Sequence, residues 1–260
     1  YKQRIAAETY AKIGNMIVSA ESLHMGSDDQ YEHYRNKMEF SFAEDTQKNI
    51  CLAFFERGGK QRIVIEESVL ANPQITAISK ELLAWVREQQ IPLRSLKSLI
   101  VRSASRTTDD GVIHHDVIAA LFIKDKLSFS SYPKVHDALK GVSIYYSTHK
   151  SPASIPTELL FHEGDTSLRQ EILGTNLSYG IFSFFQINPP VFTQALADIA
   201  AFLDPKEPLI DMYAGVGAIG LPLSRSGREL TLVESNDEAV SYAKKNILAN
   251  HFTNVDTILS

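Results

Sequence analysis

A glycine-rich segment near the C-terminal end of the chain has the residue types and spacing of a cofactor site. Gly215, Gly217 and Gly220 fit the pattern G-x-G-x-x-G, and Glu234 ends the next apolar run. Glycines let the backbone approach a ligand closely, and a carboxylate at this spacing accepts hydrogen bonds from the two hydroxyls of a ribose. The pattern is therefore typical of a site for a nucleotide-containing cofactor.

Asp211, which ends the apolar run before these glycines, favours one class of cofactor over another. At about 4 Å and an effective dielectric constant near 20, a carboxylate and a pyrophosphate repel by roughly 4 kcal/mol. The same carboxylate suits a ligand with an ammonium group, such as S-adenosylmethionine. We therefore expect S-adenosylmethionine as the cofactor. A nicotinamide dinucleotide, and a glycine cluster that serves only helix packing, are the alternatives.

These residues need a strand, a tight turn and a helix to position them. Residues 209–211 and 230–233 are predicted strands, and the turn and the start of a helix fall at 215–220. Residues 235–238 form a capping box that opens another helix, and Pro189 and Pro190 precede a helical run to residue 202. This order predicts the front half of a doubly wound parallel sheet.

The pattern of apolar residues in most of the preceding chain predicts a separate α+β unit. Strands are expected at 38–42, 96–105, 117–124, 142–147, 158–161, 169–172 and 177–182, with a hairpin of 50–56 and 62–66 around Gly58-Gly59. Helices are expected at 3–14, 74–89 and 133–140, and residues 108–111 supply a turn. The predicted fold class is thus α/β, a partial doubly wound, Rossmann-like domain that holds the expected S-adenosylmethionine site, beside an α+β central domain.

Composition excludes several classes of protein. The single cysteine, Cys51, allows no internal disulfide and is expected to be a buried structural thiol, and no apolar run reaches the length of a membrane span. The net charge of −5 argues mildly against a nucleic-acid partner, although a local basic face is compatible with it. We expect no metal site, because neighbouring residues of the strand at His114-His115-Asp116 point to opposite faces.

Four segments, in order and spacing, resemble the uracil-5 RNA methyltransferases. They are Tyr34-Arg35-Asn36-Lys37-Met38-Glu39-Phe40, His162-Glu163-Gly164-Asp165, Phe184-Phe185-Gln186-Ile187-Asn188 and Asp211-Met212-Tyr213-Ala214-Gly215-Val216-Gly217. The Phe-Phe-Gln-x-Asn segment followed by the Gly-rich loop is fairly specific, whereas the loop alone is not. The resemblance spans most of the chain.

The resemblance implies that Gln186, Tyr213 and Glu234 contact S-adenosylmethionine, alongside Asp211, Gly215 and Gly217 of the loop. A polar residue often stands at the position of Ala218, so that contact is in doubt here. No catalytic residue is expected within the chain, because the family's nucleophilic cysteine and its base would follow Ser260. In the family, the cysteine thiolate adds to C6 of uracil and activates C5 for methylation, which is covalent catalysis. We expect no turnover from this fragment.

The predicted organisation has three parts: residues 1–27, an N-terminal helix and linker packed on the catalytic domain; residues 28–176, the central RNA-binding domain; and residues 177–260, the front half of the methyltransferase domain. We expect a cytoplasmic monomer that acts on tRNA or rRNA, with no membrane partner. The alternatives are a methyltransferase for another RNA base or a protein, and a non-catalytic RNA-binding protein. Basic residues at 35–37, 57–62 and 94–106, Arg102 among them, are candidates for RNA contacts.

Overall fold

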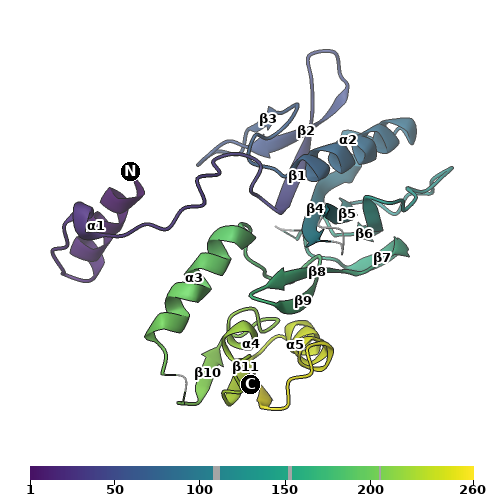
Figure 1. Cartoon of the computed structure of the whole chain (residues 1–260). Coiled ribbons are helices and arrows are strands. Elements are labelled where there is room, and N and C mark those ends of the chain that lie inside the picture. Colours follow the sequence, from purple (N-terminus) through teal and green to yellow (C-terminus); the bar gives the residue numbers. More distant parts are fainter. Residues whose placement is uncertain (108–111, 152–153, 205) are drawn as a thin grey trace.

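The computed structural model describes residues 1–107, 112–151, 154–204 and 206–260. Its largest element is a seven-stranded sheet with the spatial order β3-β2-β1-β4-β5-β6-β7, in which only β5 and β6 run parallel (Figure 1). The turn predicted at 108–111 lies outside the described residues. The strands are β1 (Lys37–Glu44), β2 (Ile50–Phe55), β3 (Arg62–Val64), β4 (Leu96–Thr107), β5 (Ile113–Ile123), β6 (Leu139–Tyr146) and β7 (Glu158–Gly164).

One face of this sheet is covered by α2 (Pro73–Glu88), so the helix predicted at 74–89 is confirmed. The helix begins where Asn72 Oδ1 accepts a hydrogen bond from the Gln74 N–H, with a proline at the first helical position. Its apolar stripe packs over β2, β4 and β5 and shares one buried core with Met38, Phe40 and Phe42 of β1. The predicted hairpin of β2 and β3 is also confirmed, closed by the Glu56 N–H and the Gln61 carbonyl at 2.8 Å.

The prediction of a short helix at 133–140 is wrong. Residues 132–138 are irregular, and β6 begins at Leu139, which is fully buried and pairs with Val117. The Val135 N–H donates to Glu163 Oε1 at 3.2 Å, and the His136 N–H donates to the Leu139 carbonyl. Pairing with the sheet thus outcompetes a helix of two turns, which is marginal by itself.

The C-terminal part contains a parallel sheet of the order β10-β11-β12, which confirms the predicted half of a doubly wound fold. Helices α3, α4 and α5 accompany these strands (Figure 1). The elements are α3 (Pro189–Phe202), β10 (Leu209–Met212), α4 (Gly220–Leu223), β11 (Leu230–Glu234), α5 (Asp237–Ala249) and β12 (Val255–Leu259).

A hairpin of β8 (Ser167–Ile172) and β9 (Thr175–Gly180) lies between the two sheets. Its buried side chains, such as Tyr179, join a core that also contains Phe122 of β5 and Leu232 of β11. The domain boundary predicted after residue 176 falls inside β9. Because β8 and β9 pair along their whole length, a boundary at this position divides two paired strands. The division into domains stays a prediction.

Helix α1 (Lys2–Ile13) begins and ends one residue earlier than the helix predicted at 3–14, and none of its residues is buried. It lies apart from both sheets and contacts the 3-10 turn η1 (Ala20–Ser22) that follows it (Figure 1). A hydrogen bond from Gln3 Nε2 to the Leu23 carbonyl supports this contact. Packing of this helix on the methyltransferase half therefore stays a prediction. No helix in the described part of the chain is long and apolar enough to cross a membrane.

Candidate cofactor-binding site

Two acidic side chains meet at one edge of the parallel sheet. β10 and β11 are parallel neighbours with Asp211 opposite Leu232, so their carboxyl ends open at the same edge. This is the edge at which doubly wound sheets bind ligands. Asp211 lies near the end of β10, Glu234 ends β11, and the Gly-rich loop (213–219) leaves the sheet beside them.

The Glu234 carboxylate closes this loop. Its Oε2 accepts a hydrogen bond from the Gly215 N–H at 2.8 Å, and its Oε1 accepts from the N–H groups of Ser235 and Asn236 at 2.8 and 2.9 Å. Although partial burial favours the neutral acid, these donors outweigh it and hold the pKa of the Glu234 carboxyl below its ordinary value. A carboxylate offers about four acceptor positions. Glu234 is therefore fixed as an anion that can still accept a hydrogen bond from a ligand.

The backbone of the loop is bent away from ordinary conformations. Gly215 and Gly217 have φ of +57° and +83°, where glycine alone is unstrained. A side chain at Gly217 would collide with Leu221, whereas nothing lies within 4 Å of the position of a Cβ on Gly215. Tyr213 also has positive φ, +62°, and is 89% exposed. A bulky residue in this region is strained, which is common at ligand sites. The open space above Gly215 suits close approach by a ligand.

Asp211 makes a contact that the sequence did not predict. Its Oδ2 accepts a hydrogen bond from the Gly220 N–H at 2.8 Å, at the start of α4. Burial, with the nearby Glu234 carboxylate, raises the pKa of Asp211 despite this bond. The carboxylate is therefore costly to hold in the fold.

Asn246 of α5 is a residue that the sequence analysis missed. It is fully buried, and its Nδ2 donates to the Val216 carbonyl at 3.0 Å and to the Ser178 carbonyl at 3.1 Å. Its Oδ1 accepts from the Ser178 N–H at 2.7 Å. Asn246 thus ties the Gly-rich loop to β9. The only signal in the sequence was one amide on the apolar face of a predicted helix.

Gln186 is not joined to this cluster by any hydrogen bond within the described residues. The segment around it is held through its backbone, where Asn36 Nδ2 donates to the Gln186 carbonyl at 3.0 Å and the Asn36 N–H to the Ile187 carbonyl at 3.1 Å. The structure therefore brings together Asp211, Gly215 and Glu234, whereas a cofactor contact of Gln186 stays a prediction.

Two other residues differ from their predicted roles, and His162 makes structural hydrogen bonds. Arg102, a candidate for RNA contacts, is 1% exposed and binds two backbone carbonyls, so it is not on an RNA-facing surface. Cys51, predicted to be buried, is half-buried, and its sulfur accepts a hydrogen bond from Arg87. His162 bonds through both ring nitrogens to Ser143 and to the Gly164 carbonyl, as expected of a structural histidine. The described residues contain no group of three metal-ligating side chains.

Replacing Asp211 by asparagine is expected to raise the melting temperature at pH 7 and to weaken cofactor binding. The amide oxygen still accepts the Gly220 N–H, while the cost of a buried charge disappears. The folded-state pKa of Asp211 is raised above its ordinary value of 3.8. The cost of burying the Asp211 charge is therefore fully present at high pH, and it disappears as the pH falls through the raised pKa towards 3.8. The gain in thermal stability should therefore shrink in acid.

The matched control for this variant is Asp237→Asn. Asp237 is an exposed acid in the first turn of α5, where a carboxylate favours the helix, so its loss should slightly lower the melting temperature. Scanning calorimetry at several pH values measures both variants. A fall in melting temperature for Asp211→Asn at pH 7 would contradict the reading of Asp211 as a strained charge.

Comparison with known proteins finds similarity to one family of RNA methyltransferases. Residues 6–113 match the profile described as tRNA (uracil-5-)-methyltransferase. An uncharacterized RNA methyltransferase of Lactiplantibacillus plantarum is 24% identical over 249 residues, which cover 88% of this chain and 49% of the relative. Another from Clostridium tetani is 25% identical over an alignment of 275 residues, which covers 100% of this chain and 57% of the relative. The chain thus spans about half the length of these relatives.

A solved structure confirms the fold. The crystal structure of Pyrococcus abyssi tRNA (uracil-54, C5)-methyltransferase in complex with S-adenosyl-L-homocysteine is similar with a TM-score of 0.75 at 16% sequence identity. The match covers 100% of this chain and 62% of that one. Together with the profile match and the related RNA methyltransferases, this similarity confirms the predicted resemblance to the uracil-5 RNA methyltransferases.

Proposed function

We propose that this chain, a relative of the uracil-5 RNA methyltransferases, carries the donor-binding half of an S-adenosylmethionine-dependent enzyme that methylates uracil C5 in tRNA or rRNA. One observation carries the choice of cofactor: the Asp211 carboxylate accepts the Gly220 N–H. In a dinucleotide site, the N–H groups that follow the Gly-rich turn are the donors for the pyrophosphate. Here the Asp211 carboxylate already accepts the hydrogen bond of one such N–H group. A pyrophosphate would therefore face a like charge and would find one N–H donor fewer.

The residues present fit S-adenosylmethionine. Glu234, held as an anion by three backbone donors, has acceptor capacity for a ribose hydroxyl, and the space above Gly215 admits a ligand against the backbone. The free oxygen of Asp211 supplies negative potential for the ligand's cationic groups. When bound, S-adenosylmethionine supplies an electrophilic methyl group on a sulfonium. The chain's own contribution is to hold and orient this donor.

Thermal shift tests the choice of cofactor. S-adenosylhomocysteine should raise the melting temperature of the protein in its full natural length, and NAD should not. At a ligand concentration of 100 times Kd, the stabilisation is about 2.7 kcal/mol. Stabilisation by NAD alone would overturn the assignment.

The reaction itself is tested by product analysis. Incubation of the full-length protein with S-adenosylmethionine and bulk tRNA or rRNA should produce 5-methyluridine in the digested nucleosides. Methylation of another base, or of protein, would favour the alternative of a methyltransferase with a different substrate. Binding of S-adenosylmethionine without methyl transfer to RNA or protein would favour the alternative of a non-catalytic RNA-binding protein. We further propose that the protein acts on RNA as a cytoplasmic monomer, which sedimentation and cell fractionation test.

A further inference from the structure

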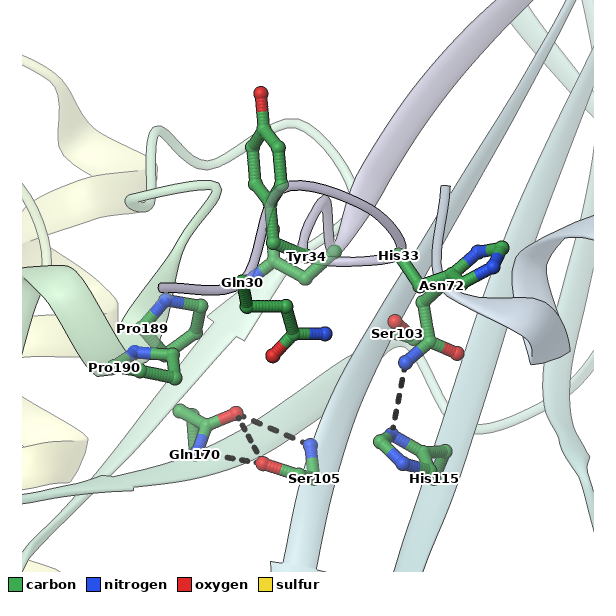
Figure 2. A pocket seen from close by; sticks show the side chains of 11 residues that line it. Gln30, His33, Tyr34, Asn72, Ser103, Ser105, His115, Gln170, Pro189 and Pro190 are labelled. Carbon is green, nitrogen blue, oxygen red and sulfur yellow. Dashed lines mark hydrogen bonds between the residues drawn. The ribbon is translucent and has the colours of Figure 1, made fainter. Parts of the chain in front are cut away.

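A pocket of about 130 Å³ lies outside the donor site, where the linker 30–36 meets β4, β5, β8 and the start of α3 (Figure 2). A single water needs only roughly 10–15 Å³ of such space, so the pocket has room for a group the size of a ring. We call it the linker pocket. The side chains that carry the argument are Gln30, Ser103, His115, Gln170, Pro189 and Pro190.

We propose that the linker pocket binds an unstacked RNA base other than the one that receives the methyl group. This inference rests on the proposed action on RNA and goes beyond it by naming a second nucleotide site. The pocket contains no residue between 211 and 234, so it is separate from the donor loop. We therefore assign the base held here to a second nucleotide site.

The lining carries no formal charge, so it favours a neutral ligand. None of the lining residues is Asp, Glu, Lys or Arg. Amides and hydroxyls dominate, and Figure 2 shows the amide of exposed Gln30 among Ser103, Gln170 and the two prolines. Side chains of this kind read the edges of bases in single-stranded RNA.

His115 presents one defined tautomer to this pocket. Asn72 Oδ1 accepts from the Gln74 N–H, so its Nδ2 is the group that donates to His115 Nδ1 at 3.3 Å. The ring proton of neutral His115 therefore sits on Nε2, and burial lowers the pKa of this histidine and favours the neutral form. The pocket thus has a histidine donor without a positive charge.

The start of α3 also argues for a base and against a phosphate. A helix N-terminus ordinarily offers free N–H groups to an anion. Here Pro189 and Pro190 have none, and the Val191 N–H already donates to Asn188 Oδ1 at 3.2 Å. The prolines leave a flat apolar wall, which suits stacking with a ring.

A place for the attached phosphate lies next to the pocket. A neighbouring groove of about 680 Å³ shares Ser105 and Gln170 with the linker pocket and is also lined by Arg106, Arg169 and Glu171. Arg106 pairs with Asp116 at 3.3 Å, whereas Arg169 is exposed and has no ion pair in the described part of the chain. We therefore assign the phosphate contact to Arg169.

Two variants test the proposal by fluorescence anisotropy with a labelled single-stranded RNA of about 12 nucleotides, a length within the span of one single-strand site. Gln30→Glu places a negative charge in the neutral pocket and should weaken binding about tenfold. Arg169→Ala removes one phosphate contact and should reduce the slope of log K against log salt by about 0.7. Both positions are exposed, so neither variant threatens folding.

Matched controls make the same changes elsewhere. Gln47→Glu lies in the β1–β2 turn, and Arg4→Ala lies in α1, apart from both sheets; both should leave RNA affinity and salt dependence unchanged. All four variants should bind S-adenosylhomocysteine like the parent protein. An RNA with one abasic position should lose affinity like Gln30→Glu, and the two losses should not add.

The outcomes separate the two proposals. If the parent protein binds S-adenosylhomocysteine but no RNA, the proposed function fails, and the linker pocket fails with it. If RNA binds and Gln30→Glu behaves like Gln47→Glu, the linker pocket alone is overturned. Loss of RNA affinity confined to Gln30→Glu and Arg169→Ala, with intact donor binding, supports it.

Discussion

Replacing Glu234 by glutamine is expected to weaken S-adenosylhomocysteine binding by about tenfold to a hundredfold. Loss of a hydrogen bond to a charged group costs roughly 1.5–3 kcal/mol, and every 1.4 kcal/mol is a factor of about ten. Glu234 uses both oxygens on backbone donors, Oε2 on Gly215 and Oε1 on Ser235 and Asn236. Glutamine has one oxygen, so its NH2 group must face an N–H on one side. The affinity for S-adenosylhomocysteine and the stability of the Gly-rich loop should therefore both fall.

Glu229→Gln is the matched control, because Glu229 is exposed and precedes the other end of β11. It makes the same change without touching the loop and should leave donor binding unchanged. The pH adds a second check. The folded-state pKa of Glu234 lies below its ordinary 4.5, so its contribution to stability is present above that value and is lost as the pH falls through the folded-state pKa. The variant and the parent should therefore converge in stability in acid. Equal donor affinities by calorimetry at pH 7 would remove Glu234 from the site.

The candidate site was more predictable from the sequence than the connections that hold it. Asp211, Gly215 and Glu234 follow a spacing that a parallel strand-turn-helix unit imposes, and the structure brings all three together. The partner of Asp211 was not predictable, because the Gly220 N–H reaches it only once α4 begins at a definite residue. Nothing in the spacing of residues distinguishes a carboxylate that awaits a ligand from one that caps a helix.

The elements of the fold also differ in how well the sequence predicts them. The helix at 74–89 and the strand at 38–42 have periodic apolar residues and form as predicted. The helix at 133–140 was inferred from a short segment without strong periodicity, and the non-local pairing of Leu139 with Val117 decided its conformation. Arg102 was misread for a related reason: a charged residue on a strand usually faces water, and its two carbonyl partners lie far along the chain.

Replacing Arg102 by methionine is expected to lower the free energy of unfolding by about 3 kcal/mol or more. Arg102 Nη1 donates to the carbonyls of Gly180 and Ser183, each at 2.7 Å, and hydrogen bonds to charged groups contribute roughly 1.5–3 kcal/mol apiece. The guanidinium also lies 5.0 Å from the centre of the Tyr179 ring. Methionine relieves the cost of burying a charge, but it leaves two carbonyls without this donor. We expect the second effect to win, because both bonds are short and well formed.

Arg106→Met is the control on the same strand and the same face, four residues on. Arg106 is exposed and pairs with Asp116 near the surface, where such pairs contribute at most about 1 kcal/mol. Urea denaturation should therefore separate the two variants clearly. Since Gly180 and Ser183 lead directly into the segment 184–188, Arg102→Met should also weaken S-adenosylhomocysteine binding if that segment lines the donor site. A loss of stability for Arg102→Met no greater than for Arg106→Met would show that the buried arginine does not hold the central sheet to the methyltransferase half.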